Sequence, residues 1–246
     1  MPIKNILISQ PKPIHRSPYD DLVKKYDITV DFRKFFDIEP LPAREFRKAR
    51  IDLASFTSVI FTSKVAIDHY FRLSEELRFL IPSTMKYFCM NETIANYLNK
   101  YIVYRKRKIS FADGNVDDLV NLLSKYPEEK YLLPVADSHK NTLSNKLKRK
   151  KLKVVKAVSY KIVSSDLTDL GFDYDIVVLF SPSGVKALQE NFPNYNSEKS
   201  KIAAFGAETC KAVTKAGYKL EIKAPTSEHP SMTMALDTYL KKNEGK

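Results

Sequence analysis

Short apolar runs alternate with helix-length segments along almost the whole chain. Most of these runs are continuously apolar, which is typical of parallel strands that are buried on both faces. A chain in which strands and helices alternate in this way folds as an α/β protein with parallel sheets. The runs expected to form strands are residues 5–9, 59–63, 87–90, 101–104, 131–136, 175–181, 201–206 and 219–224.

The sequence also contains an internal repeat, which predicts two similar α/β domains. In each copy a strand ends in small hydroxyl residues and leads into a helix, and a second strand-to-helix junction follows. Two of the matched pairs share one offset, since 209 − 93 and 232 − 116 both equal 116. The matched segments, in order, are 59–67 with 178–188, 90–93 with 206–209, and 116–123 with 232–239.

The two copies are not consecutive along the chain. The second copy begins near Asp175, so a βαβ piece at residues 1–33 remains and is expected to complete the second sheet. The chain would then cross between domains twice, through two extended segments that form a two-stranded β linker beside a cleft. The expected domains are 1–33 plus 167–246, and an inserted domain at 42–153, with linkers at 34–41 and 154–166.

Composition restricts the compartment and the kind of partner. The 246 residues are 43% apolar and 28% charged, which predicts a globular protein with a real core. No apolar run approaches the ~20 residues of a membrane span, and we expect no signal peptide. With Cys89 and Cys210 alone, a disulfide framework is excluded and a cytoplasmic location is expected. The net charge of +12 favours an acidic partner.

Polar and small residues recur where the predicted strands lead into helices. Ligands of open α/β sheets bind at this edge, where helix N-termini and hydroxyl groups suit anionic oxygens. For any one of these positions, ordinary helix capping is the favoured explanation. Their recurrence in both domains predicts a ligand with several separated anionic groups. The candidate binding residues are Thr62, Ser63, Lys64, Asn91, Thr93, Ser181, Ser183, Gly184, Gly206 and Thr209.

The motifs of better-known catalytic sites are missing from the sequence. It contains no GxGxxG, P-loop or GxSxG pattern, and its histidines and cysteines lack metal-ligand spacing. We therefore expect no cofactor and no metal, and we expect His69 to be a surface or packing residue. Tyr160, in the second linker, is interpreted either as a proton donor or as a packed side chain.

Two basic runs, 105–108 and 146–156, leave a nucleic-acid-binding function open. No recognition-helix or RNA-binding motif accompanies them, so solvated helix and loop surfaces are the simpler interpretation. A nucleic-acid partner is therefore not the expectation.

Several short motifs occur in the order found in one enzyme family. They are Phe180-Ser-Pro-Ser-Gly184, Ile60-Phe-Thr-Ser63, Phe205-Gly-Ala-Glu-Thr209, Gly114-Asn115, Tyr160 and Ala224-Pro-Thr226. With these motifs the chain resembles the uroporphyrinogen-III synthase family over nearly its whole length. Each motif is only moderately specific, and their succession carries the resemblance.

The resemblance implies two flavodoxin-like domains joined by a two-stranded linker. It further implies a monomeric, cofactor-free lyase that cyclises hydroxymethylbilane to uroporphyrinogen III, with loss of water and inversion of ring D. Tyr160 would assist departure of the hydroxyl group, and the strand-end residues would bind the substrate's carboxylates. Gln10, Met90 and Glu208 depart from the family's common pattern, which leaves a non-catalytic anion-binding or regulatory protein of this fold as an alternative.

Overall fold

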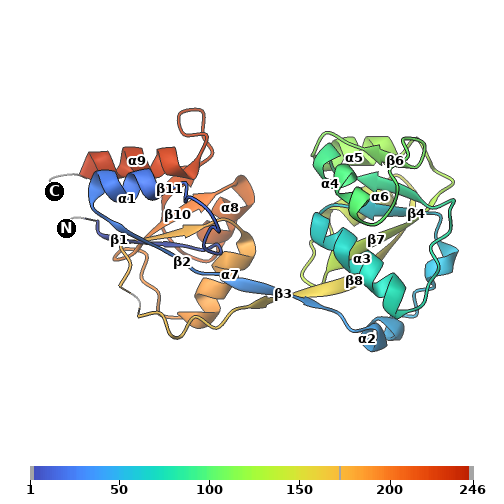
Figure 1. The fold of residues 1–246 in the computed structure, drawn as a ribbon, viewed down its shortest axis with the longest axis horizontal. Coiled ribbons are helices and arrows are strands. Elements are labelled where there is room, and N and C mark those ends of the chain that lie inside the picture. The colour runs from blue at the N-terminus through green and yellow to red at the C-terminus, as the bar shows by residue number, and fades with distance from the viewer. Residues whose placement is uncertain (1–2, 172, 244–246) are drawn as a thin grey trace. The chain divides into compact units, whose positions relative to one another are not determined.

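The structure is a computed structural model that describes residues 3–171 and 173–243. The chain divides into two compact units, and each has its own sheet flanked by helices (Figure 1). Unit 1 comprises the chain up to Asp37 and from Val163 onward, and unit 2 is Ile38–Ile162. The chain therefore passes from unit 1 to unit 2 inside segment 34–41 and returns inside segment 154–166.

The strands of unit 1 lie in the order β11-β10-β9-β1-β2, and all neighbouring pairs are parallel. This is the flavodoxin-like strand order, in which the first strand lies between the second and the third. The bounds are β1 Asn5–Ile8, β2 Thr29–Phe32, β9 Ile176–Leu179, β10 Lys201–Phe205 and β11 Leu220–Ala224.

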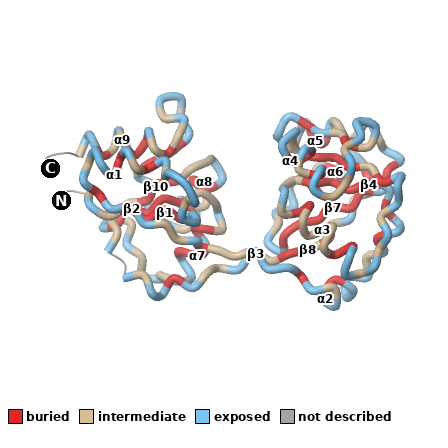
Figure 2. The backbone as a smooth tube through the Cα atoms, viewed as in Figure 1, coloured by how far each residue is buried: buried red, intermediate tan, exposed pale blue. Residues whose placement is uncertain are grey.

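Helices cover both faces of the unit 1 sheet because successive strand residues point to opposite faces. Ile6 and Ile8 pack beneath α1 (Asp20–Tyr26) and α9 (Met232–Asn243), which lie side by side in Figure 1. Leu7 points to the other face, where α7 (Pro182–Asn191) and α8 (Ala207–Lys215) pack. The central strands are accordingly the most buried parts of the unit (Figure 2).

The sheet of unit 2 has the order β3-β8-β7-β4-β5-β6, and the strands from β8 to β6 are parallel. Helices α3 and α4 pack on one face of this sheet, and α5 and α6 pack on the other. The strands are β3 Phe36–Pro40, β4 Ser58–Phe61, β5 Lys86–Cys89, β6 Ile109–Phe111, β7 Lys130–Ala136 and β8 Lys153–Ser164. The helices are α2 Ala43–Lys48, α3 Lys64–Glu76, α4 Glu92–Tyr97, α5 Val116–Leu123 and α6 Thr142–Arg149, with 3₁₀ turns η1 Leu53–Ser55 and η2 Leu98–Lys100.

Unit 2 is a circular permutation of unit 1. The series β4-α3-β5-α4-β6-α5 occupies the places of β9-α7-β10-α8-β11-α9, and β7-α6-β8 occupies those of β1-α1-β2. In unit 1 the βαβ piece comes first along the chain, whereas in unit 2 it comes last. Both units therefore have the flavodoxin-like spatial order, and the repeat in the sequence corresponds to the shared series.

The two segments that connect the units lie next to each other at the edge of the unit 2 sheet. Leu41 N–H donates to the Ser159 carbonyl at 3.1 Å, and Ser165 N–H donates to the Phe35 carbonyl at 2.9 Å. Phe35 thus lies opposite Ser165 and Leu41 opposite Ser159. Because the two segments run in opposite directions, β3 is antiparallel to β8. The first part of β8 also pairs with β7 as far as Tyr160, which makes it a core strand of unit 2.

One predicted strand is wrong. Residues 101–104 form no strand, and the strand at this place in the sheet is β6, which pairs with β5. The apolar run at 101–104 instead packs side chains against the core, with the Tyr101 ring stacked on Phe71 at 4.4 Å between centroids. An irregular segment that packs side chains on the core thus shows the same apolar run in the sequence as a buried strand.

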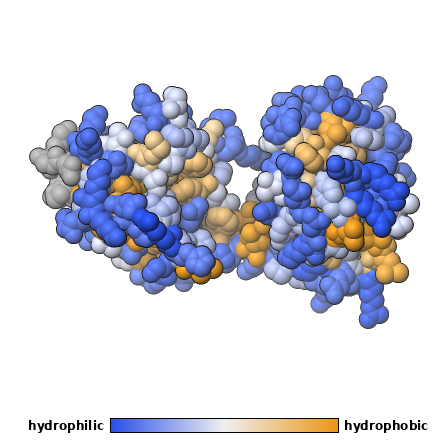
Figure 3. Space-filling view, turned by 45° about the horizontal axis from the view of Figure 1, so that its top comes forward, coloured by the Kyte–Doolittle hydropathy of each residue, from blue (hydrophilic) through white to orange (hydrophobic). Residues whose placement is uncertain are grey.

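The described residues expose few large apolar side chains. Hydrophilic side chains dominate the visible surface of both units, and hydrophobic ones form small scattered patches (Figure 3). None of the helices between residues 3 and 243, leaving aside position 172, has the length and apolar character needed to cross a bilayer.

A buried carboxylate holds the amino ends of three strands of unit 2 together. Glu129, before β7, accepts hydrogen bonds from Thr57 and from Ser58 of β4, the latter at 2.7 Å, and it pairs with Lys86 of β5. Burial alone raises the pKa of Glu129, but these hydrogen bonds outweigh burial and hold the pKa below its usual value. The ionised form is therefore the one that stabilises the fold.

We predict that Glu129→Gln lowers the free energy of unfolding by about 2 kcal/mol at pH 7, because it removes charge-assisted hydrogen bonds from buried partners. Since the folded pKa is depressed, this stabilisation is present above the unfolded pKa of about 4.3 and is lost as the pH falls through the folded pKa. Urea unfolding of both proteins between pH 7 and pH 3 measures the difference. The neighbouring exposed Glu128→Gln is the control, and an equal effect of both substitutions would contradict the assignment.

Candidate functional site

Side chains at the carboxyl ends of the unit 2 strands cap the helices that follow. Ser63 Oγ accepts from Ala66 N–H at 3.1 Å, at the end of β4. The Asn91 side chain, after β5, accepts from the backbone three residues on at 3.0 Å, and Asn115, after β6, does the same at 2.9 Å. Extended residues followed by a helix leave N–H groups unpaired, and these side chains satisfy one of them each.

Unit 1 repeats this arrangement at the equivalent strand ends. Ser181 Oγ accepts from Gly184 N–H at 3.1 Å after β9, and Ser231 Oγ accepts from Met234 N–H at 3.2 Å after β11. After β10 the cap is Gly206, with φ of +88°, a conformation that favours glycine. The equivalent pairs are thus Ser63 with Ser181, Asn91 with Gly206, and Asn115 with Ser231.

This equivalence corrects one match made from the sequence. The Thr93–Thr209 pair is out of step by one residue, because counting from the caps places Thr209 opposite Ile94. The burial of the side chains supports this alignment, because Thr209 is 3% exposed whereas Thr93 is exposed. The shared Glu-Thr letters produced the mismatch, and the two threonines have different surroundings.

Capping does not use up the hydrogen-bonding capacity of these side chains. A serine hydroxyl that accepts a backbone N–H still carries a proton to donate, and an asparagine that accepts through its oxygen keeps its NH₂ group. Ser63, Ser181 and Asn91 are each partly exposed. Ser181 and Asn91 can therefore stabilise the start of a helix and donate to an anionic oxygen at the same time, whereas the Ser63 hydroxyl also bonds the phenol of Tyr160.

The remaining predicted residues differ in their access to solvent. Thr62 and Ser183 are half-buried beside the caps, and Lys64 is exposed with its Nζ 5.3 Å from the centre of the Tyr97 ring. Gly184 is buried, and a Cβ there would lie 3.6 Å from Ser181 Oγ. Thr209 and Gly184 are accordingly the least accessible candidates, and Lys64 and Thr93 are exposed.

Ser9 is a member of the unit 1 strand end that the sequence interpretation missed. It follows β1, is 7% exposed, and would lie 3.7 Å from a Cβ at Gly184. The first turn of α7 thus lies next to Ser9, and a Cβ at Gly184 would meet Ser9 only at ordinary van der Waals distance. Ligands of this fold bind beside the first strand, between β1 and β9, which is where Ser9 and Ser181 lie. The sequence feature that could have identified Ser9 is its position directly after the first apolar run.

Tyr160 lies on β8 of unit 2, where it pairs with Ala136 at the carboxyl end of β7. Its ring is 8% exposed and packs in the core, stacked on His69 with ring centres 4.9 Å apart and an angle of 20°. Burial raises the pKa of Tyr160 above its usual value, and a hydrogen bond with the Ser63 side chain offsets part of this rise. The ring is therefore packed, while the phenol oxygen reaches the end of β4. His69, expected to be a surface or packing residue, contacts this tyrosine directly.

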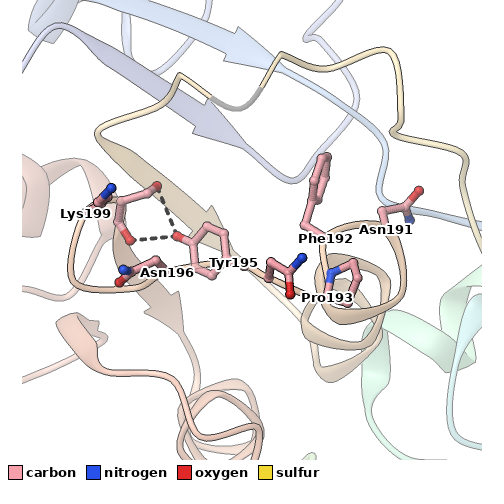
Figure 4. Close-up of a pocket in the computed structure, with 8 residues that line it drawn as sticks. Asn191, Phe192, Pro193, Tyr195, Asn196 and Lys199 are labelled. Atoms are coloured by element: carbon pink, nitrogen blue, oxygen red, sulfur yellow. Dashed lines mark hydrogen bonds between the residues drawn. The ribbon is translucent and has the colours of Figure 1, made fainter.

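A pocket of 380 Å³ elsewhere in unit 1 contains none of the predicted site residues. It lies in the loop between α7 and β10, and Figure 4 shows its lining from Asn191 to Lys199. Dashed lines in the figure mark hydrogen bonds from the Tyr195 hydroxyl to Ser200, at 2.8 Å to the carbonyl and 3.0 Å to Oγ. Because this loop leads into the amino end of β10, the pocket lies opposite the edge where ligands bind in this fold.

The basic runs also lie mostly away from the capped strand ends of unit 2. Residues 105–108 precede β6, and most of 146–156 belongs to the end of α6 and the start of β8. Residues 105–108, and those of 146–156 at the turn from α6 to β8, therefore lie near the amino ends of the strands, whereas Lys146 and Lys156 contact residues at the starts of α5 and α6. Lys146 pairs with Asp117, and Lys156 donates to Asn141 Oδ1 at 2.7 Å.

The fold and the strand ends define a class of protein: a two-domain α/β protein, permuted within one chain, whose strand ends suit a polyanionic small molecule. A sequence model described as uroporphyrinogen-III synthase HemD matches residues 17–234, which span most of both units. The chain belongs to the uroporphyrinogen-III synthase family, whose members are enzymes of tetrapyrrole synthesis in haem formation. The nucleic-acid-binding and non-catalytic alternatives are not favoured.

Two solved structures share this fold over nearly the whole chain. A mutant uroporphyrinogen III synthase from the extremely thermophilic bacterium Thermus thermophilus is 17% identical, with a TM-score of 0.63 and coverage of 98% of this chain and 100% of that one. A uroporphyrinogen-III synthetase from Helicobacter pylori has the same identity and coverage, with a TM-score of 0.60. At this identity the likeness concerns the fold. A search of curated proteins gives no match.

We predict that Ser63→Ala and Ser181→Ala each lower the free energy of unfolding by about 1 kcal/mol, because each leaves a helix start uncapped. Asparagine at either position caps equally well, so Ser63→Asn and Ser181→Asn should keep the stability of the unchanged protein. Urea unfolding followed by circular dichroism measures both effects. Thr93→Ala, at an exposed helical position, is the control, and a loss of the same size there would contradict the capping role.

Proposed function

We propose that this chain is a uroporphyrinogen-III synthase that acts as a lyase on hydroxymethylbilane. The reaction closes the linear tetrapyrrole with loss of water and inverts ring D by way of a spiro intermediate. The observation that carries the proposal is the family match over residues 17–234, together with capped strand ends that recur in both units. We further propose that the enzyme acts as a monomer in the cytoplasm and needs no cofactor or metal.

Substrate binding follows from the charge of the ligand. Hydroxymethylbilane carries eight carboxylates, and the chain has a net charge of +12 that attracts such a ligand over distance. At the strand ends, free hydroxyl protons and helix N–H groups then supply directional hydrogen bonds. The proposed substrate-binding residues are Thr62, Ser63, Lys64, Asn91 and Thr93 in unit 2, and Ser181, Ser183, Gly184, Gly206 and Thr209 in unit 1.

The proposed proton donor is Tyr160. Its raised pKa keeps the phenol protonated at neutral pH, so the phenol has a proton to give to the leaving hydroxyl. As the carbon–oxygen bond breaks, the hydroxyl takes this proton and departs as water. Ring closure later releases one proton from a ring carbon, which restores the phenol. Positioning of the chain for attack at the correct ring D carbon supplies the rest of the rate.

The test of this function is an isomer-resolved assay. Freshly generated hydroxymethylbilane closes spontaneously to the type I isomer, so the purified protein is added and the oxidised products are separated. An excess of type III isomer over a sample without protein supports the proposal. Type I isomer alone, from a folded sample, would remove the catalytic function.

We predict that Tyr160→Phe lowers kcat by a factor on the order of 10², because it removes the phenolic proton and leaves the packed ring in place. KM should change little, since the ring is buried and the carboxylate-binding side chains are untouched. The same assay gives both constants, and circular dichroism checks the fold. Full activity in the variant would leave Tyr160 as a packing residue only.

A further inference from the structure

We propose that Arg72 and His69 of α3 are positioning residues that fix the phenol of Tyr160 on β8. This inference rests on the proposed function only in assigning Tyr160 as the proton donor. Two hydrogen bonds carry the inference. The Arg72 guanidinium donates to the His69 ring, which stacks on Tyr160, and to the carbonyl of Ser159, which precedes Tyr160.

Arg72 donates in several directions at once. Its Nη2 donates to the Leu41 carbonyl at 2.9 Å and to the Ser159 carbonyl at 3.1 Å, and its Nε donates to His69 Nδ1 at 3.2 Å. Its Nη1 pairs with Glu76 at 2.5 Å, one helical turn further along α3. An ordinary surface ion pair would use Glu76 alone. Here most of the donors are directed at groups beside Tyr160, and the side chain is only 24% exposed.

One of the two carbonyls that Arg72 binds, that of Ser159, belongs to a β-bulge. Pairing between β7 and β8 passes from Val135–Val158 to Ala136–Tyr160, so Ser159 has no pairing partner on β7. An extra residue of this kind redirects the side chain that follows it. The Ser159 carbonyl accepts from both Leu41 N–H and Arg72, and its hydroxyl donates to the Ala157 carbonyl at 2.9 Å. The direction of Tyr160 is thus held from the backbone.

His69 holds the same phenol from the side-chain direction. Because Nδ1 accepts from Arg72, the neutral ring carries its proton on Nε2, and the Arg72 bond fixes the ring's orientation. Burial and the nearby Arg72 charge both lower the pKa of His69, against smaller opposing effects of Asp68 and Glu76. An uncharged ring therefore stacks on Tyr160 at neutral pH. Since Ser63 caps the same helix, α3 supplies the stacked ring, the guanidinium and the hydroxyl that contacts the phenol.

The kinetic test compares variants in two backgrounds. Arg72→Met removes every donor, His69→Phe keeps a ring to stack but removes the acceptor, and His69→Asn keeps an acceptor but removes the ring. In the unchanged protein we expect Arg72→Met to lower kcat about tenfold with little change in KM, because a small misplacement of a reacting group is costly. In a Tyr160→Phe background the same change should have almost no further effect. The control is Lys186→Met, which breaks an exposed ion pair with Glu190 on α7.

A spectroscopic measurement tests the positioning without any activity. In protein labelled with ¹³Cζ-tyrosine, the Tyr160 resonance is identified by its loss in Tyr160→Phe. Arg72→Met and His69→Asn should shift this resonance and change the pKa of the phenol, and Lys186→Met should do neither. If Tyr160→Phe proves fully active, the proton-donor role fails, yet a shifted resonance would still support the positioning. An unmoved resonance in folded Arg72→Met protein would overturn it, as would an equal loss of kcat in both backgrounds.

Discussion

Parallel strands that end at one edge of a sheet leave backbone N–H groups unpaired where each helix begins, and this constraint organises both units. Ser63 and Ser181 satisfy it in the same way at equivalent strands, and Asn91 does so one strand further along in unit 2. Gly206, at the equivalent place in unit 1, has no side chain that could accept from the helix. The groups that stabilise the helix starts are also groups that donate hydrogen bonds to anions. Under the proposed function, folding and ligand binding therefore depend on the same residues.

The capped strand ends occur in both units although the two units are not consecutive along the chain, and the circular permutation explains this. Moving the βαβ piece from the start of the series to its end preserves the spatial order of the strands. The strand at the switch point, next to which ligands of this fold bind, is β1 in unit 1 and β7 in unit 2. Consequently Ser9 follows that strand in one unit, whereas Tyr160, on the next strand, reaches the same edge in the other.

The sequence was sufficient for features that are local. Apolar runs, hydroxyl residues before helices and the ordered repeat predicted α/β topology and the Ser63, Asn115 and Ser181 junctions, because caps depend on residues three apart. Features that depend on distant contacts were missed. The apolar run at 101–104 packs without pairing, and nothing local marks the Ser159 bulge. The role of Arg72 depends on carbonyls 31 and 87 residues away, which no spacing rule anticipates.

The central claim of the proposed function is that the capped strand ends bind carboxylates of the ligand. Calorimetric titration with uroporphyrin III, a stable octacarboxylate, tests it in the unchanged protein, Ser63→Asp and Ser181→Asp. Aspartate still caps the helix, so the fold persists, but its charge repels carboxylates. We predict that either substitution reduces the affinity at least about tenfold, a loss of about 1.4 kcal/mol. Unchanged affinity in both variants would contradict the claim.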